Sequence, residues 1–523
     1  MNKFKLFPLA LAAFAFSACT SEDAVENNPN VEGVKSYVAV NINNVGAGGT
    51  RADGDYVYGA ANENAISKVR FYFFTQAGQP YLMENNKSYV EAIPTLTAGT
   101  TENVEKFSNA ILVINGASKT APYSMMAVAN PEQFGTALHD KMSRSDVENA
   151  VADKAFSGNE DTAADFVMSS SVYAEGGVKM WTSDISGYVQ TTKEAALTAP
   201  VDIYVERVAA KLMTSTGGEV KTLTDATTGQ EFKAYLVGQT TEGTDVYAKI
   251  NGWGLADESK EAKLIKDITP TWKNADLDFS EANPWNVEAY HRCFWETTIA
   301  FENTKKAWSD FTTTSEKPYY TLPNTTALNP QYVVAAKLVY ADGTAAEISS
   351  YKGVEYLSEK DVKKVILAEN KKFFKKDGVT AEGTNKYANL DPEDITFVVK
   401  ADGSYEVKAQ LNGEFELFEK VGDSYNPVTA VAVNAKLGET AAQIRKGGMA
   451  YYYTDIKHLN GKSALVRNHV YKIDIQKITG FGTPVYNPDN GFDPTKPDKV
   501  ETFLAAKINV LSWRVVNQSV NLE

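Results

Sequence analysis

The chain has 523 residues, of which 43% are hydrophobic and 23% charged, a globular composition in a chain too long for one core. The formal net charge of -14 argues against nucleic acid as a partner, because nucleic-acid binding relies on clustered lysines and arginines. The only two cysteines are Cys19 and Cys293, and the first lies in a segment expected to be removed, so no internal disulfide is predicted.

The N-terminus has the layout of a bacterial secretory signal. Two lysines precede an apolar stretch from Leu6 to Phe16, and two small residues then lead to Cys19. A cysteine at this place resembles a lipobox, so we expect a signal peptide over residues 1–18 and lipidation of Cys19; an ordinary signal peptide is the alternative. The polar residues that follow are typical of a flexible tether.

The stretch "KSYVAVNINNVG" alternates in the manner of a half-buried strand, with Val38, Val40 and Ile42 on one face. It leads into the glycine-rich loop "GAGGTRADGDY", which carries one arginine, Arg51. Strand-length apolar runs separated by Gly, Asn and Pro follow, and one or two short helices are predicted over residues 131–151. These elements predict a first β domain.

The segment "APVDIYVERVAAKLMTST" is predicted to be one long strand, with a domain boundary near residues 215–218. The predicted domains are therefore residues 52–217 and 218–523. In the second half, the pairs Asp342-Gly343 and Asp402-Gly403 each stand between alternating runs and predict hairpins. Between them, a surface helix is predicted from its N-cap Ser358 to Phe373.

Candidate catalytic and metal-binding motifs are scarce. No histidine stands in a zinc-binding pattern, and His291 and Cys293 are predicted to be packing residues. Asp489 and Asp493 lie in a proline-rich stretch, residues 484–499, whose spacing favours a stiff linker over a calcium loop. We therefore expect no enzyme, no cofactor and no metal site.

Several segments together resemble a known family. They are the lipoprotein signal, the first strand with its arginine loop, "VERVAAKL" at 205–212, "SALVRNHVYKIDIQKI" at 463–478, and the C-terminal "INVLSWRVVNQSVNLE". Over nearly its full length the chain resembles the fimbrillins of Bacteroidetes-type (type V) pili, the FimA/Mfa superfamily, and among them the Mfa-like shaft subunits of minor fimbriae.

The resemblance implies a mainly β protein with two transthyretin-like β-sandwich domains, a few short helices and a C-terminal donor strand. It implies export as a lipoprotein precursor on the outer membrane and cleavage by an arginine-specific protease between Arg51 and Ala52. That cut would remove the propeptide, residues 19–51 with the first strand, and leave 472 of the 523 residues. The implied partners are further copies of the chain, accessory tip and anchor subunits, and host or bacterial surface receptors. The implied location is an adhesive fimbrium on the cell surface.

The terminal strand, residues 503–523, is the expected donor. Its apolar residues change face twice, which predicts a bulge or two successive roles. Residues 508–515 are expected to close the chain's own sheet and residues 516–522 to serve a neighbour. The donor residues are Ile508, Val510, Leu511, Trp513, Val515, Val516, Val520 and Leu522. A surface carbohydrate-binding lipoprotein is the main alternative function, and a secreted hydrolase on a β scaffold is a weaker one.

Overall fold

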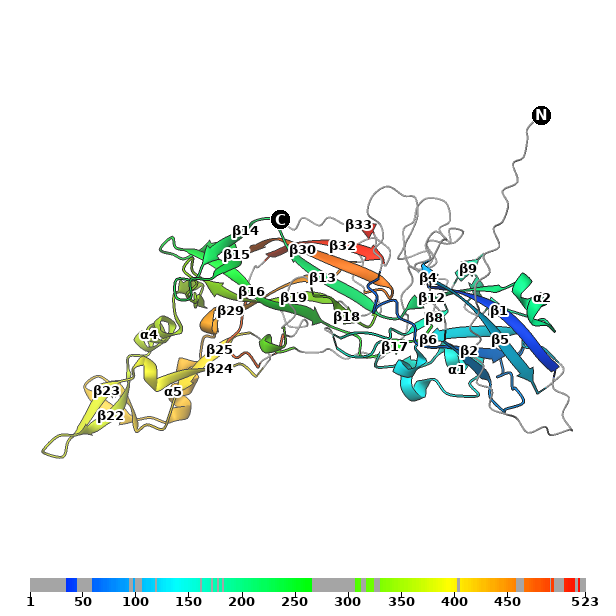
Figure 1. The fold of residues 1–523 in the computed structure, drawn as a ribbon. Helices are drawn as coiled ribbons and strands as arrows, with labels where there is room; N and C mark the ends of the chain where they lie inside the picture. The colour runs from blue at the N-terminus through cyan, green and yellow to red at the C-terminus, as the bar shows by residue number, and fades with distance from the viewer. Residues whose placement is uncertain are drawn as a thin grey trace.

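The fold is taken from a computed structural model of the chain. It describes residues 34–44, 59–93, 97–98, 106–117, 120–159, 162–170, 173–175, 178–180, 183–265, 306–311, 317–323, 330–401, 405–457, 465–489, 491–492, 503–512 and 516–517. The protein is mainly β, as predicted, and its sheets lie in three successive regions (Figure 1).

The N-terminal domain is built on one nine-stranded sheet. Its buried runs "VRFYFF" and "SMMAVA" form adjacent strands, as expected for apolar segments of strand length. In sheet order the strands are β3 (Tyr89–Ala92), β2 (Val69–Phe74), β6 (Ser124–Ala129), β8 (Met168–Ser170), β12 (Val201–Arg207), β1 (Val34–Asn44), β5 (Lys106–Gly116) and β4 (Thr97–Ala98), with β11 (Ser183–Asp184) on β6.

Short helices accompany this sheet. The helices expected over residues 131–151 are present as η1 (Pro131–Ala137) and α1 (Arg144–Glu148), the latter begun by a capping box between Ser143 and Asp146. The remaining elements of the region are α2 (Lys193–Thr198), the pair β9 (Tyr173–Glu175) and β10 (Val178–Met180), and β7 (Val151–Ala152), which pairs with β17 (Ala262–Lys263).

The segment predicted as one long strand is in fact two strands in different sheets. β12 ends at Arg207 in the N-terminal sheet, and β13 (Ala210–Thr216) begins three residues later and pairs with β18 and β30 of the second domain. The chain thus changes sheet at Val208 and Ala209, before the expected boundary at residues 215–218. Both residues are fully buried, so an uninterrupted apolar pattern conceals the break.

The second domain is a sandwich of two sheets. Leu212 and Ile473 from one sheet share a core with Tyr235 and Trp253 from the other. The first sheet has the order β18 (Tyr319–Thr321), β13, β30 (His469–Thr479), β32 (Phe503–Ser512) and β33 (Val516–Asn517). The second has the order β14 (Val220–Thr224), β15 (Glu231–Gln239), β16 (Asp245–Ala256), β19 (Gln331–Val339), β29 (Met449–Asp455) and β31 (Thr483–Pro484). The short η4 (Trp308–Asp310) and η6 (Lys446–Gly448) adjoin it.

A third region, the inserted unit (residues 349–444), leaves the second domain after β19 and returns before β29. It has its own buried core, which includes Val362, Ile366 and Phe397. One sheet has the order β21 (Val354–Tyr356), β20 (Ser349–Tyr351), β28 (Ala442–Ile444), β25 (Val407–Leu411) and β24 (Ile395–Val399); the other has β23 (Asn385–Asn389), β22 (Phe373–Val379), β26 (Leu417–Val421) and β27 (Ser424–Pro427). Its helices are α4 (Glu359–Glu369), α5 (Ala430–Leu437) and η5 (Pro392–Asp394).

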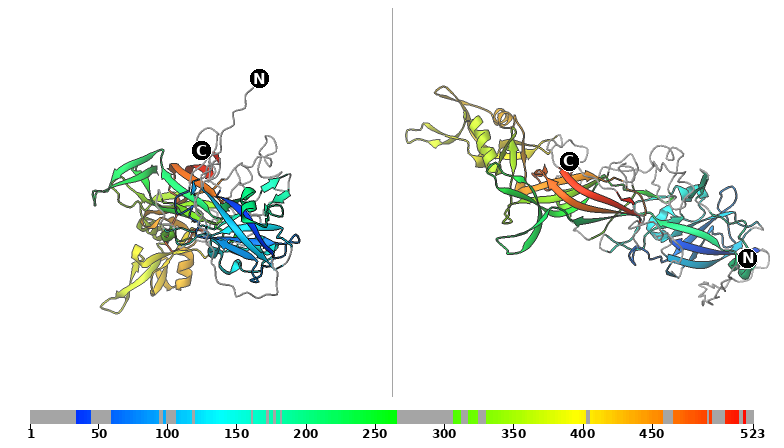
Figure 2. Two further views of the ribbon diagram at one scale, coloured as in Figure 1. Left: turned by 45° about the vertical axis from the view of Figure 1, so that its right-hand side comes forward. Right: turned by 90° about the horizontal axis from the view of Figure 1, so that it is seen from above.

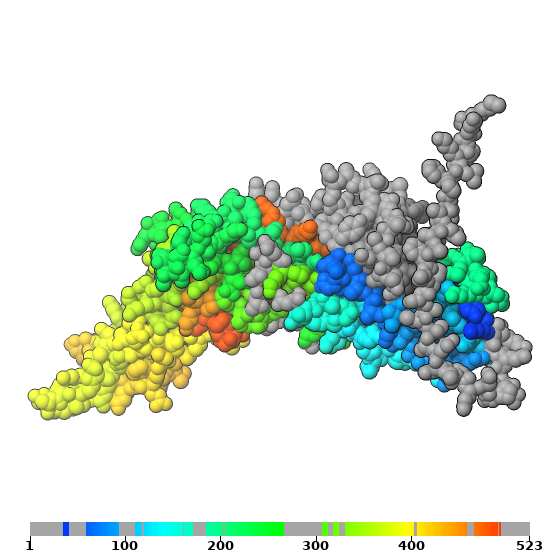
Figure 3. Space-filling model, in the orientation of Figure 1, coloured from blue at the N-terminus to red at the C-terminus, as the bar shows by residue number. Residues whose placement is uncertain are grey.

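The three regions follow one another along an elongated molecule. The N-terminal sheet occupies one end, the sandwich the middle, and the inserted unit projects at the opposite end, in yellow (Figures 1 and 2). The space-filling view shows the inserted unit as a tapering arm (Figure 3). Within the described ranges, no helix has the length and apolar character needed to cross a membrane.

Local predictions in the second half have mixed outcomes. α4 begins after the N-cap Ser358, as predicted, but ends at Glu369, before Phe373. β24 and β25 pair antiparallel, which confirms the hairpin around Asp402-Gly403, although that pair itself lies outside the described residues. The hairpin predicted at Asp342-Gly343 is present in short form: Gly343 has a φ of 85°, the Tyr340 amide donates to the Thr344 carbonyl at 2.9 Å, and Val339 bridges antiparallel to Ala345.

The proline-rich stretch at residues 484–499 differs from a free linker over its described part. Val485 is 3% exposed and Phe492 is 1% exposed. The Phe492 ring lies 5.3 Å from that of Tyr451 and 5.0 Å from that of Tyr453, both on β29. Pro484 and Pro488 therefore stand beside apolar anchors that fasten the described part of this segment to the second domain.

Candidate functional site: the first strand and the domain junction

The predicted first strand is β1, and it lies inside the N-terminal sheet rather than at its edge. It pairs antiparallel with β5 along its whole length, from Val34 opposite Gly116 to Asn44 opposite Lys106. On its other side it pairs in parallel with β12, where Val40 stands opposite Val201. Among the described strands, β1 alone separates β5 from β12 (Figure 1).

Two of the three residues predicted to anchor this strand are core residues. Val38 and Val40 are both 0% exposed and belong to the N-terminal core. Ile42 stands opposite Ile203 of β12 and Ser108 of β5 in the backbone register. The strand therefore contributes both backbone hydrogen bonds and apolar contacts to the domain, which are the two terms that hold a sheet strand in place.

The structure does not describe the residues of the predicted processing step. Cys19, Arg51 and Ala52 lie outside the described residues, and the described chain resumes at Gly59. β1 and the rest of the domain are thus joined through residues 45–58, the segment that contains Arg51.

The C-terminal strand is placed in the second domain as β32, antiparallel to β30. Ile508, Val510 and Leu511 stand opposite Ile473, Tyr471 and Val470. β33 folds back so that Val516 stands opposite Val510. The other predicted donor residues, Trp513, Val515, Val520 and Leu522, lie outside the described residues.

A buried ionic cluster, which the sequence did not indicate, ties residues 60–63 to the domain junction. Glu63 is 0% exposed, and its Oε1 lies 2.5 Å from the Lys211 Nζ on β13. The Tyr320 hydroxyl on β18 donates to the same oxygen at 2.5 Å, and the Ala60 amide donates to Oε2 at 2.8 Å. Residues 60–63 are thereby fastened to two strands of the second domain.

Arg207 extends this cluster into a network. Its Nε donates to the Glu63 carbonyl at 2.8 Å, and its other nitrogens donate to the side-chain oxygens of Asn64 and Asn468. The backbone N–H of Asn468 in turn donates to the Ala209 carbonyl at 2.8 Å. The segments "VERVAAKL" and "SALVRNHVYKIDIQKI" therefore meet at the junction. We call Glu63, Asn64, Arg207, Lys211, Tyr320 and Asn468 the junction cluster.

Electrostatics keep the junction cluster charged. Burial alone would raise the pKa of Glu63, but the Lys211 ammonium and the hydrogen bonds from Lys211, Tyr320 and Ala60 outweigh it, so the pKa lies below its usual 4.5. Burial, followed by the charge of Glu63 and its hydrogen bond, raises the pKa of Tyr320, so this hydroxyl remains a donor. A buried charge pair with these extra hydrogen bonds is costly to break.

The remaining residues considered for chemistry are scattered. His469 is buried, and its Nδ1 lies 2.7 Å from the Arg467 carbonyl. His139 is exposed, and its Nδ1 lies 2.8 Å from the Asp140 carbonyl. Asp489 is exposed in a turn. His291, Cys293, His458 and Asp493 lie outside the described residues. No group of three or more metal-ligating side chains occurs in the part of the chain that the structure describes.

Comparison with protein families finds one region of this chain that is similar to a known family. Residues 445–519 match the family described as "Major fimbrial subunit protein type IV, Fimbrillin, C-terminal". No curated protein matches the chain.

Three solved structures illustrate the structural likeness. A fimbrilin from Porphyromonas gingivalis W83 is 14% identical, with 92% of this chain and 98% of that chain covered and a TM-score of 0.40. The tip fimbrial protein Mfa3 from Porphyromonas gingivalis is 10% identical, with 92% and 100% covered and a TM-score of 0.31. A fimbrial assembly protein from Parabacteroides distasonis is 11% identical, with 73% and 98% covered and a TM-score of 0.29.

The family match covers β30 and β32, which pair with each other in the first sheet of the second domain, and it includes Arg467 and Asn468 at the junction. The predicted resemblance is thereby supported over residues 445–519, which are similar to the C-terminal region of fimbrillins.

Proposed function

We propose that this chain is a structural subunit of a bacterial surface fimbria that supports adhesion. It is exported as a lipoprotein precursor, cleaved after Arg51 and polymerised by exchange of strands between subunits. The family match at residues 445–519 supports the fimbrial assignment. The observation that carries the assembly step is the position of β1, which is held between β5 and β12 and joined to the rest of the domain through the segment containing Arg51.

Cleavage between Arg51 and Ala52 would cut the covalent link between β1 and the rest of the chain. Departure of β1 would leave unpaired backbone donors and acceptors along β5 and β12. It would also uncover the sites of Val38 and Val40, whose full burial stabilises the sheet by about 1.5 to 3 kcal/mol each. An open groove of this kind favours the addition of another strand.

The strand that enters the groove would come from the C-terminal segment of a neighbour. β32 pairs with β30 over residues 503–512, so the donor would lie within residues 513–523, which include the predicted donor segment 516–522; the short pairing of β33 with β32 would have to open first. Within them, Val516, Val520 and Leu522 are separated by even numbers of residues, so in an extended strand they lie on one face. Val38, Val40 and Ile42 share a face of β1 for the same reason, so the donor face could fill the same sites. A head-to-tail contact that does not close on itself yields a filament.

The precursor would be attached to the outer membrane by a lipid on Cys19 until an arginine-specific protease releases it. Accessory tip and anchor subunits, together with host or bacterial surface receptors, complete the proposed set of partners. The alternative is a monomeric carbohydrate-binding lipoprotein of the cell surface, which requires neither cleavage at Arg51 nor a donor strand.

The test is digestion of purified precursor with an arginine-specific protease, followed by native electrophoresis and negative-stain microscopy. We expect filaments from the natural sequence, no filaments from Arg51→Ala, and monomers from a chain cut at Arg51 but lacking residues 513–523. Arg144→Ala is the matched control, since it removes another surface arginine outside the processing segment. Filaments from Arg51→Ala, or from the shortened chain, would reject strand exchange in this form, and monomers throughout would favour the carbohydrate-binding alternative.

A further inference from the structure

One segment of the N-terminal domain flanks β1 without being a full strand of the sheet. It comprises residues 187–199, between β11 and β12, and we call it the latch. The Tyr37 N–H of β1 donates to the Gln190 carbonyl at 2.7 Å, and the Gln190 N–H donates to the Tyr37 carbonyl at 2.9 Å. The side of β1 that faces away from β5 is therefore divided: β12 pairs with residues 40–44, and the latch holds the half before them.

The helix of the latch, α2, covers the same half of β1. It lies against β1 and β5 (Figure 1). Ala39 is 3% exposed, although the alternation of the strand puts its side chain on the face opposite to Val38 and Val40. Ala196 of α2 is 0% exposed, and neither alanine belongs to the N-terminal core. These two burials indicate that α2 rests on the outer face of β1.

The latch is lightly attached to the rest of the domain. Within the described ranges, the two bonds between Gln190 and Tyr37 are the only backbone hydrogen bonds that join it to a strand. α2 has six residues, too few for a helix that is stable by itself, and Tyr188 and Leu197 are each 40% exposed. Segments with few buried contacts open at a much lower free-energy cost than global unfolding. The latch can therefore open while the sheet stays folded.

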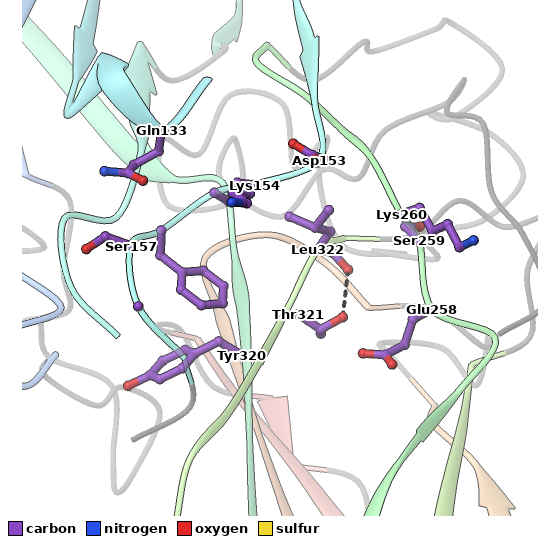
Figure 4. A pocket seen from close by; sticks show the side chains of 13 residues that line it. Gln133, Asp153, Lys154, Ser157, Glu258, Ser259, Lys260, Tyr320, Thr321 and Leu322 are labelled. Carbon is purple, nitrogen blue, oxygen red and sulfur yellow. Dashed lines mark hydrogen bonds between the residues drawn. The ribbon is translucent and has the colours of Figure 1, made fainter. Parts of the chain in front are cut away.

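The other half of β1 is held more firmly. It pairs in parallel with β12, which ends at Arg207 in the junction cluster. Beside the junction cluster, a cavity of about 650 Å³ lies between the N-terminal and second domains, with Tyr320 in its wall (Figure 4). The Tyr320 ring lies 4.9 Å from that of Phe166, and its hydroxyl donates to Glu63. Parting β12 from β1 would strain this packed end, whereas opening the latch would not.

We propose that the latch controls strand exchange: it opens to let residues 34–39 of β1 leave, and it then closes on the strand that enters from a second copy of the chain. Once β1 has left, the N–H and carbonyl of Gln190 are a donor and an acceptor with which an incoming strand can pair, as Tyr37 does in the precursor. The inference rests on the proposed function, because it concerns the groove that cleavage at Arg51 opens.

The first experiment uses the uncut precursor and measures amide hydrogen exchange over residues 34–44 by mass spectrometry. Gln190→Pro removes the N–H that bonds to Tyr37, so residues 34–39 should exchange roughly fivefold to tenfold faster, the effect of one lost hydrogen bond. Residues 40–44, which pair with β12, should change less. Gln190→Ala is the matched control, because it keeps both backbone groups and should exchange like the natural sequence.

A second variant covers the case in which Gln190→Pro does not fold. The Thr192 Oγ1 caps α2 by accepting from the Ala195 N–H at 3.2 Å, so Thr192→Ala should loosen the latch and speed the same exchange severalfold. Thr429→Ala is its control, because it removes the corresponding cap of α5, where the Thr429 Oγ1 accepts from the Ala432 N–H at 3.3 Å. Exchange over residues 34–44 should be unchanged in this control.

The same variants are then cut with an arginine-specific protease in an excess of synthetic peptide of residues 513–523, and native mass spectrometry follows loss of the fragment that contains β1. We expect faster loss from Gln190→Pro and Thr192→Ala than from their controls. The latch is overturned if the loosened variants either exchange or lose β1 no faster than these controls. Loss at one rate from all variants would leave strand exchange standing without the latch, whereas no loss from any variant would reject both.

Discussion

Glu63 and Lys211 form a charged pair that is separated by 148 positions in the sequence and shielded from solvent in the fold. Replacing Glu63 with Gln leaves the Lys211 ammonium buried without its countercharge. We expect Glu63→Gln to lower the free energy of unfolding by about 3 kcal/mol, the usual cost of breaking a buried pair from one side. Urea titration followed by circular dichroism measures this change.

Two further variants separate the charge effect from other consequences of substitution. Glu439→Gln removes a carboxylate that pairs with Lys436 at 3.4 Å on the surface, and it should cost less than about 1 kcal/mol. Adding Lys211→Met to Glu63→Gln should recover part of the stability, because no unpaired ammonium then remains buried. If Glu63→Gln costs no more than the surface control, the junction cluster has no special role in stability.

The lowered pKa of Glu63 gives the pair a defined pH dependence. A carboxyl group whose pKa is lower in the folded than in the unfolded chain stabilises the fold above the unfolded value and ceases to do so as pH falls through the folded value. The stability difference between the natural sequence and Glu63→Gln should therefore be constant from pH 7 to about pH 5.5 and shrink below the usual pKa of 4.5. Urea midpoints at half-unit pH steps test this, and a difference that grows on acidification would contradict it.

At the scale of single elements, α4 allows a local test. The Ser358 Oγ accepts from the Asp361 amide at 3.2 Å and begins a helix that buries Val362 and Ile366 in the inserted unit. Ser358→Ala should destabilise this helix by about 1 kcal/mol. Faster amide hydrogen exchange over residues 359–369 would report it, whereas Ser424→Ala on exposed β27 should leave that exchange unchanged.

The elements that could be predicted are those whose signals are local. Alternating apolar residues indicated β1, and a capping serine indicated the start of α4. The break between β12 and β13 could not be predicted, because Val208 and Ala209 are buried and continue the apolar run. The two strands join different sheets only through pairings with distant segments, which a local pattern does not contain.

The same limit applies to the candidate site. The first strand and the terminal strand, residues 503–523, were predicted as exchange partners from their patterns and the family resemblance, and the structure gives the pairings of β1 and β32 inside this chain. The junction cluster was missed because Glu63, Lys211 and Tyr320 each resemble ordinary surface or packing residues in sequence. Only the folded chain brings them together and buries them, so no spacing rule would have revealed them.

At the scale of the whole molecule, residues of the second domain form part of the hydrophobic core of the N-terminal domain. The N-terminal core includes Tyr320, Val466 and Val470 from the second domain. The fully buried Arg467 donates to the carbonyls of Lys263 and Leu264, next to the strand pair β7–β17. Together with the junction cluster, these contacts favour two domains that move as one body, whereas the inserted unit has a core of its own.

The inserted unit leaves and re-enters the second domain at paired positions. Ser349 and Ser350 of β20 stand opposite Ile444 and Gln443 of β28, and Arg445 donates to the Ile348 carbonyl at 3.1 Å. Residues 351–442 can therefore be replaced by Asn-Gly, because Ser350 and Gln443 are directly opposite and a two-residue turn connects such a pair. We expect this shortened chain to fold with the two remaining domains intact.

Some loss of stability is expected, since Tyr486 and Phe492 of the second domain contact Phe397 and Tyr405 of the inserted unit and would become more exposed. The matched control joins Ser350 to Ala442 through the same Asn-Gly turn, which shifts the register by one residue and turns the side chains of β28 to the opposite face. Thermal unfolding should show a cooperative transition for the in-register chain and a lower, broader one for the control. If the in-register chain fails to fold, the inserted unit is part of the second domain's core, and its separate hydrophobic cluster does not mark an independent unit.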